Sequence, residues 1–254
     1  MSLPPSGERA ASHSIGAQPR CFALVPCAGS GQRAGPGGPK QYRMVAGRPV
    51  VAHTLAALQA VERIAATLVV LSPGDTDFEQ WVTPPAQHPW VARCGGDTRA
   101  ASVAAGLDEL LARGAQPHDW VLVHDAARCL ITPALIDRLI DACWGDEIGG
   151  LLALPLADTL KHAGADSRIA ATLDRTGKWA AQTPQMFRLG LLRPALAQAG
   201  EAVTDEASAV EALGHAPLLV RGALDNFKLT WPEDFTLAER LLRANAGAAS
   251  EATC

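Results

Sequence analysis

Short apolar runs alternate along the chain with longer segments in which apolar residues recur at helical spacing. The first four apolar runs are CFALVP, ATLVVLSP, VARCGG and DWVLVHDAA. The segments that follow them are PVVAHTLAAL, a short Pro-bounded stretch near residues 78–81, RAASVAAGLDELLARG and TPALIDRLIDACWG. Strands that recur with helices of this length need crossover connections, which are typical of parallel sheets. The pattern therefore predicts an α/β fold, with a mainly parallel, Rossmann-like sheet flanked by helices.

The second half of the chain is less regular. Three further β-like runs are GGLLALPL, APLLVRGA and NFKLTW, with the helical TDEASAVEALG between the first two and PEDFTLAERLLRA at the end. Between residues 155 and 184 the sequence is polar, compatible with β structure and poor in core residues, so we expect an ordered hairpin that protrudes as a β-arm over about residues 156–183. We predict a single domain over residues 21–245, a disordered tail over 1–20 and a loose tail over 246–254.

Composition and charge narrow the class of protein. The chain has 254 residues, of which 48% are hydrophobic and 19% charged, and a net charge of −4, which argues against nucleic acid or an anionic membrane as its main partner. The first twenty residues lack the apolar core of a signal peptide, and no apolar run approaches the roughly 20 residues of a membrane span. Six cysteines show no metal-binding spacing. We expect a soluble cytoplasmic protein with reduced thiols.

A glycine-rich loop, VPCAGSGQRAGPGGPKQY, follows the first strand and carries Arg33 and Lys40 but no acid. Glycine allows such a loop to turn its backbone N–H groups toward an anion. The loop fails the Walker pattern, because Lys40 lies between Pro39 and Gln41, and it matches the dinucleotide pattern G-x-G-x-x-A only weakly. We expect the loop to bind a polyphosphate, with Arg33 and Lys40 as the cations that contact it. The alternative is a merely flexible turn.

Other strand ends also carry polar residues, and ligands of open parallel sheets bind beyond those ends. Asp125 follows the strand at 120–123 and precedes Arg128 by three positions. A carboxylate beside a polyphosphate suits Mg²⁺, although it could instead cap a helix and pair with Arg128. Asp97 and Ser102 flank the start of RAASVAAGL, where free N–H donors are expected; ordinary capping is again the alternative.

Taken together, these stretches resemble the 2-C-methyl-D-erythritol 4-phosphate cytidylyltransferases of the non-mevalonate isoprenoid pathway. The matching segments, in the family's order, are PCAGSGQR, GPKQY, GGDTRAAS, VHDAAR, ADTLK, TLDRTGKWAAQTPQMF, TDEASAVE and DNFKLTWPED. Cys27 and Cys129 stand where alanine and proline are usual, and the N-terminal tail is extra. The resemblance implies the nucleotidyltransferase fold and a reaction that joins CTP to 2-C-methyl-D-erythritol 4-phosphate and releases pyrophosphate.

The resemblance also implies a role for each candidate residue and a homodimer in which the β-arm crosses into the neighbour's site. The cations expected to act in catalysis are Arg33, Lys40, Arg175 and Lys228. Backbone contacts to CTP are carried over to Ala28, Gly29 and Gly31, and the cytosine-reading loop to Gly96, Asp97 and Ser102. The metal carboxylate maps onto Asp125, as a ligand of Mg²⁺. The alcohol-phosphate pocket maps onto Arg128, Thr159, Arg175, Thr183 and Lys228.

Two other functions fit part of this pattern. A related enzyme could couple CTP to ribitol 5-phosphate, since only the alcohol pocket would differ; the segment TLDRTGKW favours methylerythritol phosphate. A nucleotide sensor or a glycosyltransferase-like binder could use the glycine-rich loop without turnover. Without the resemblance, Arg175 reads as a solvated charge on a β-arm and Lys228 as an edge-strand lysine.

Overall fold

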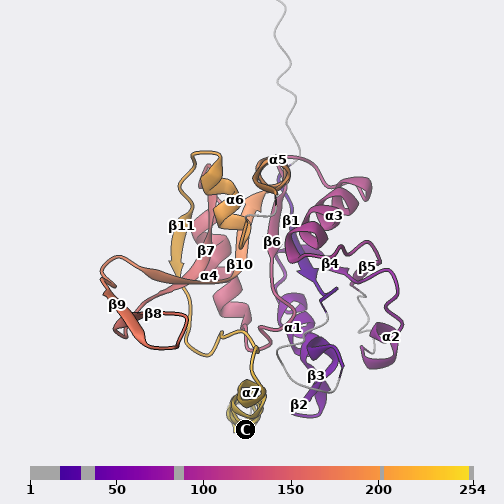
Figure 1. The fold of residues 1–254 in the computed structure, drawn as a ribbon. Helices are drawn as coiled ribbons and strands as arrows, with labels where there is room; N and C mark the ends of the chain where they lie inside the picture. Colours follow the sequence, from indigo (N-terminus) through magenta and orange to yellow (C-terminus); the bar gives the residue numbers. More distant parts are fainter. Residues whose placement is uncertain (1–17, 30–37, 83–88, 201–202, 252–254) are drawn as a thin grey trace, which may run out of the picture.

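A seven-stranded sheet forms the centre of the molecule in the computed structural model, which describes residues 18–29, 38–82, 89–200 and 203–251 (Figure 1). Its strand order is β11-β7-β10-β6-β1-β4-β5. In chain order the strands are β1 (Cys21–Pro26), β4 (Ile64–Val70), β5 (Trp90–Ala92), β6 (Trp120–Val123), β7 (Gly149–Pro155), β10 (Trp179–Arg188) and β11 (Leu218–Arg221). All neighbouring strands pair in parallel except β10, which is antiparallel to both β6 and β7. The predicted α/β class with a mainly parallel sheet is confirmed.

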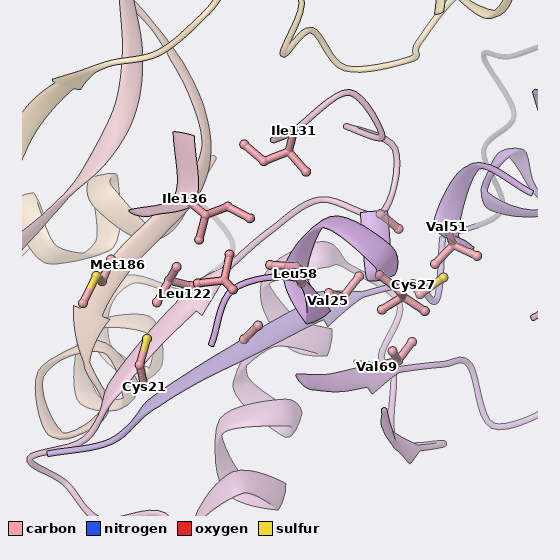
Figure 2. Close-up of a cluster of buried hydrophobic side chains, with 14 of the residues drawn as sticks. Cys21, Val25, Cys27, Val51, Leu58, Val69, Leu122, Ile131, Ile136 and Met186 are labelled. Carbon is pink, nitrogen blue, oxygen red and sulfur yellow. The ribbon is translucent and has the colours of Figure 1, made fainter. Parts of the chain in front are cut away.

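Helices cover both faces of this sheet, and alternation along β1 shows why. Ala23 and Val25 point into one buried cluster, whereas Phe22 and Leu24 point into the other. The first cluster, part of which Figure 2 shows, is completed by α1 (Val50–Gln59) and α4 (Pro133–Cys143). The second is completed by α3 (Arg99–Ala112), α5 (Leu189–Ala199) and α6 (Glu206–Ala212). The central strands are therefore buried on both sides, which fits their continuous apolar sequences.

The C-terminal helix α7 (Pro232–Glu251) packs against the short strand β2 (Met44–Val45), which follows β1. The other small elements are η2 (Lys40–Tyr42) and β3 (Arg48–Pro49) on either side of β2, and the short helix α2 (Phe78–Trp81) after β4. Phe235 and Ala238 of α7 share a third buried cluster with Val45 and Leu229. The helix continues to Glu251, which corrects the prediction of a loose tail for residues 246–251; the alanine-rich sequence there favours helix.

The chain before β1 is held at its last residue. The backbone N–H of Arg20 donates to Asp119 Oδ1 at 2.7 Å, and its guanidinium donates to Asp119 Oδ2 at 2.8 Å. The prediction of a disordered tail over residues 1–20 is therefore wrong at Arg20, because a buried carboxylate fixes that residue. Residues 1–17 lie outside the described part of the chain.

Two elements of the second half were not predicted. The first half of strand β10 reads as part of the polar stretch between residues 155 and 184, because the strand carries the polar residues Gln182, Thr183 and Gln185, which are buried. These amides are satisfied: Gln185 Nε2 donates to Asp205 Oδ2 at 2.9 Å, and Gln182 Nε2 donates to a backbone carbonyl at 2.8 Å. Helix α5 contains Pro194, which disfavours a helix when the sequence is read alone.

One predicted strand is wrong. The run NFKLTW forms an extended loop outside the sheet, because its backbone bonds go elsewhere. The N–H of Leu229 donates to the carbonyl of Ala127 at 2.8 Å, in the loop that follows β6. This loop places Lys228 at the carboxyl edge of the sheet.

The predicted arm is present as a two-stranded antiparallel hairpin of β8 (Leu160–Ala163) and β9 (Ile169–Leu173). It connects β7 to β10 and extends beyond the β11 side of the sheet (Figure 1). Every residue of β9 is exposed, including Ile169 and Leu173. Among the described helices, none combines the length and the apolar character that crossing a membrane requires.

Candidate functional site

A cavity of about 760 Å³ opens at the carboxyl edge of the parallel strands. Loops after β1, β4, β5 and β6 converge there with the loop that carries Lys228. Of the residues predicted from the sequence, its lining includes Ala28, Gly29, Lys40, Gly96, Asp97, Ser102, Asp125 and Lys228. Arg33 and Gly31 lie outside the described residues. The position agrees with the rule that open parallel sheets bind ligands beyond their carboxyl ends.

Hydrogen bonds from η2 fix the start of the glycine-rich loop. Gln41 Nε2 donates to the carbonyls of Cys27 and Gly29, each at 3.1 Å. Lys40, on the same turn, donates from Nζ to the carbonyl of Leu229 at 3.0 Å. The half-buried Lys40 thus lies between the loop after β1 and the loop that carries Lys228, at the wall of the cavity.

The loop after β5 packs directly on the loop after β1. A Cβ atom added at Gly95 would lie 2.4 Å from Ala28 Cβ and 2.7 Å from the carbonyl oxygen of Leu71, so only glycine fits. Ser102 is buried, and its hydroxyl accepts from the N–H of Gly96 at 3.2 Å. Ser102 therefore shapes the loop, whereas Gly96 and Asp97 are exposed at the cavity.

Capping, the alternative role considered for Asp97, belongs to another residue. Thr98 is the N-cap of α3, and its hydroxyl accepts from the N–H of Ala101 at 3.0 Å. The carboxylate of Asp97 is left free of that role. A similar result holds for Asp125, since α4 is capped by Thr132.

Asp125 lies at the centre of a cluster of cations. Its Oδ1 is 2.8 Å from Arg99 Nε, and its Oδ2 is 2.8 Å from Lys228 Nζ and 3.7 Å from Arg128 Nε. Burial alone would raise the pKa of this carboxyl, but Arg99 and Lys228 outweigh burial and hold the pKa well below its usual range. Asp125 is therefore a permanent anion at the floor of the cavity.

A chain of hydrogen bonds supports the backbone of Asp125. Its N–H donates to Thr183 Oγ1 at 3.0 Å, and Thr183 Oγ1 lies 3.0 Å from His124 Nδ1. His124 Nε2 lies 3.2 Å from the carbonyl of Arg128. Because a carbonyl only accepts, Nε2 carries the proton and Nδ1 accepts from the Thr183 hydroxyl. Burial lowers the pKa of His124 to about 4, so the ring is neutral.

The residues predicted for the alcohol-phosphate pocket are not all brought together. Arg128 donates from Nη1 to the carbonyl of Asn226 at 2.8 Å, and Thr183 is buried with its hydroxyl committed behind Asp125. Thr159 and Arg175 are exposed on the arm, where the Arg175 guanidinium donates to the carbonyl of Ala157. Neither lines the cavity of its own chain.

Sequence reasoning missed Arg99 and Glu206. The guanidinium of Arg99 donates to Glu206 through Nη1 at 2.6 Å and Nη2 at 3.0 Å, while its Nε binds Asp125. Both residues occur in segments that carry the family resemblance, GGDTRAAS and TDEASAVE, but 107 positions separate them. No spacing rule pairs residues so far apart, and an acid in the first turn of a helix reads as an ordinary partner of the helix dipole.

The donor set suits a metal only together with a ligand. Within the residues that the structure describes, no group of three or more His, Cys, Asp or Glu side chains could hold a metal ion. Mg²⁺ in nucleotide sites is commonly bound by one or two carboxylates, with phosphate oxygens and waters as its other ligands. A single carboxylate, Asp125, in a cavity with cationic walls fits a metal ion that is held jointly by the protein and a bound phosphate. It does not fit a metal ion held by protein ligands alone.

Comparisons with known proteins agree with this geometry. The family model for 2-C-methyl-D-erythritol 4-phosphate cytidylyltransferase matches residues 21–244. A protein of that name from Burkholderia cenocepacia is 54% identical over 235 residues, 91% of this chain and 99% of its own length. The bifunctional enzyme IspD/IspF of Albidiferax ferrireducens is 62% identical over 88% of this chain, which spans only 53% of that relative.

Solved structures show the same fold. A crystal structure of 4-diphosphocytidyl-2C-methyl-D-erythritol synthase aligns with a TM-score of 0.79 and 43% identity, over 88% of this chain and 99% of the other. The cytidylyltransferase from Thermus thermophilus aligns with a TM-score of 0.71 and 34% identity, over 88% of this chain and 99% of the other. With sequence, fold and site in agreement, the chain belongs to the 2-C-methyl-D-erythritol 4-phosphate cytidylyltransferase family.

Proposed function

We propose that this chain joins CTP and 2-C-methyl-D-erythritol 4-phosphate to give 4-diphosphocytidyl-2-C-methyl-D-erythritol and pyrophosphate. The observation that carries the proposal is the cavity at the sheet edge, where glycine-rich backbone meets Lys40 and Lys228 around the anion Asp125. Such a site offers positive charge and backbone donors to a triphosphate. A relative named for this activity is 54% identical to this chain over 99% of its own length.

The chemistry needs positioning and charge more than proton transfer. A phosphate oxygen of the alcohol substrate attacks the α-phosphorus of CTP in line, the bond to the β-phosphate breaks, and pyrophosphate leaves with the electron pair. The nucleophile is already an anion, so no base is required. Lys40 stabilises charge on the triphosphate, and Lys228 moves from Asp125 to the phosphate that reacts.

Mg²⁺ is part of the proposal, with Asp125 as its protein ligand. When bound, the ion supplies neutralising charge to the phosphate oxygens. The chain contributes a carboxylate that stays ionised because Arg99 and Lys228 lie beside it. Release of Lys228 to substrate leaves Oδ2 of Asp125 open to a cation.

Cytosine is read by the loop after β5 in this proposal. Gly96 and Asp97 are exposed at the cavity, and Ser102 fixes the loop through the N–H of Gly96. A loop held by a buried hydroxyl presents its donors and acceptors in one geometry, which selection of a base requires.

The alcohol phosphate is bound, we propose, between two chains of a cytoplasmic homodimer. Thr159 and Arg175 lie on the exposed arm and do not line their own chain's cavity. The arm also exposes apolar side chains, with Ile169 67% and Leu173 46% exposed, which are suited to burial against a second copy. In such a dimer Arg175 would belong to the partner's site.

Pyrophosphate release tests the proposal. The full chain is mixed with CTP, Mg²⁺ and either 2-C-methyl-D-erythritol 4-phosphate or ribitol 5-phosphate, and the products are identified by mass. We expect turnover with the first alcohol and little with the second. Preference for ribitol 5-phosphate would refute the substrate, and CTP binding without pyrophosphate release would indicate a nucleotide-binding protein that is not an enzyme.

A further inference from the structure

Arg99 joins two buried carboxylates that come from distant parts of the chain. Its Nε lies 2.8 Å from Asp125 Oδ1, and its two terminal nitrogens lie 2.6 and 3.0 Å from the two oxygens of Glu206. We propose that Glu206 and Arg99 are positioning residues, which act together to hold the Asp125 carboxylate in its working orientation. The proposal rests on the function proposed for Asp125.

The Arg99 guanidinium, with its bonds to Glu206 and Asp125, forms a fork that is rigid because each of its parts is fixed. Glu206 is fully buried at the first position of α6, and both its oxygens are used by Arg99. A planar guanidinium held by two parallel hydrogen bonds has little freedom to rotate. Its Nε therefore points in one direction, toward Asp125 Oδ1.

This arrangement gives the two oxygens of Asp125 different tasks. Oδ1 is anchored to Arg99, whereas Oδ2 faces Lys228 at the cavity. When Lys228 turns to a substrate phosphate, Oδ2 keeps only its longer contact with Arg128 Nε, at 3.7 Å, while Oδ1 stays anchored. The carboxylate can then meet an incoming ligand without a search among rotamers, and none of the binding energy is spent on ordering it.

A purely structural role for Glu206 is the competing explanation, since it also links α6 to α3. The first turn of α6 has other attachments, however. Asp205 and Ser208 form a capping box, and the N–H of Ala207 donates to Gln185 Oε1 at 2.8 Å. Val210 of the same helix is fully buried in the core. We therefore expect α6 to stay in place when Glu206 loses its charge.

The test is a double-mutant cycle between Glu206→Gln and Asp125→Asn in the full chain, with kcat for pyrophosphate release as its readout. If Glu206 acts through Asp125, Glu206→Gln lowers kcat about ten-fold in the wild-type background and less than about two-fold in the Asp125→Asn background. Arg99→Lys should behave like Glu206→Gln, because one ammonium group lacks the fork that bridges both carboxylates.

A second readout does not depend on turnover. Calorimetry gives the Kd of CTP with and without Mg²⁺; we expect Glu206→Gln to reduce the tightening by Mg²⁺ in the same direction as Asp125→Asn. Val210→Ala is the matched control, since it loosens the same helix away from the fork. It should lower the melting temperature while kcat and the effect of Mg²⁺ stay within about two-fold of wild type.

The possible outcomes separate this inference from the proposed function. Equal losses from Glu206→Gln in both backgrounds, or losses matched by Val210→Ala, would mean that Glu206 serves packing alone and would overturn the inference. A wild-type rate for Asp125→Asn would instead refute the proposed role of Asp125, and the inference would fall with it. Among these results, only a normal rate for Asp125→Asn would count against the function proposed for Asp125.

Discussion

The carboxyl edge of the sheet and the β-arm are built in opposite ways. At the sheet edge, polar side chains are tied to partners before any substrate arrives: Asp125 has Arg99 and Lys228, and Ser102 holds Gly96. On the arm, the two-stranded hairpin has no core, and Arg175 and Thr159 lie exposed. One region is preorganised within a single chain, whereas the other has its polar side chains turned outward.

This difference suggests a division of labour. A preorganised cavity suits the nucleotide, whose triphosphate needs fixed charges. The arm suits the second substrate, which under the proposed function is enclosed only when a partner's cavity meets the arm. The four predictions that follow test whether the two regions do separate jobs.

The largest expected effect is at the sheet edge. Lys40→Ala should lower kcat roughly 10²-fold, while the Kd of CTP rises much less, because the charge of Lys40 matters most as negative charge develops in the transition state. Turnover kinetics and calorimetry measure the two quantities. Lys161→Ala, which removes an exposed lysine of the arm, is the matched control. Equal losses in rate and binding would make Lys40 a passive part of the cavity.

The next prediction joins the two regions by complementation. Lys40→Ala and Arg175→Ala chains are each expected to be nearly inactive. If Arg175 acts in the partner's site, random reassociation of equal pools restores about a quarter of wild-type activity, since half of the dimers are mixed and each has one intact site. No recovery, with mixed dimers confirmed by mass, would place Arg175 in its own chain's site.

A smaller effect is expected at the base-reading loop. Asp97→Ala and Ser102→Ala should each reduce the preference for CTP over UTP by roughly ten-fold, about the value of one hydrogen bond. Competition assays with both nucleotides measure the preference. Arg175→Ala, on the arm, should leave it unchanged. Selectivity that survives both changes would assign base reading to backbone groups alone.

The last prediction concerns stability against acid, which changes no rate at neutral pH. The pKa of His124 is lowered by burial to about 4, below its ordinary 6.5, so the unfolded chain takes up a proton between these values while the folded chain does not. This contribution to stability is present above pH 6.5 and is lost as the pH falls toward 4, up to about 3 kcal/mol. Denaturant unfolding at several pH values measures it. His162→Gln, an exposed control on the arm, should keep the same pH dependence, and His124→Gln should flatten it.

The sheet edge was largely predictable because its signals are local. Each apolar strand is followed by its polar or glycine-rich loop, so Lys40, Asp97 and Asp125 could be placed at one edge from the order of elements alone. The hairpin of the arm was predictable for a related reason, since a long polar stretch between strands lacks the apolar residues of a core.

What remained hidden depends on contacts between distant residues. The middle of strand β10 gives no apolar signal, because its buried polar side chains Gln182 and Gln185 are satisfied by partners elsewhere in the chain. The pairing of Arg99 with Glu206 spans 107 positions. The run NFKLTW has the composition of a strand, but the N–H of Leu229 is taken by the loop after β6. Tertiary context overrides local preference in each case.

The arm's attachment makes it a detachable module. It is inserted between two strands that are direct neighbours, and their ladder persists to the base of the arm, where Pro155 faces Trp179 and the N–H of Leu156 donates to the carbonyl of Lys178 at 3.0 Å. A two-residue turn in place of residues 157–177 would close an ordinary β-hairpin without shifting the register of either strand, and it would shorten the loop whose closure costs entropy. Such a trimmed chain is expected to fold as a monomer that still captures CTP, a minimal scaffold on which other acceptor-binding loops could be grafted.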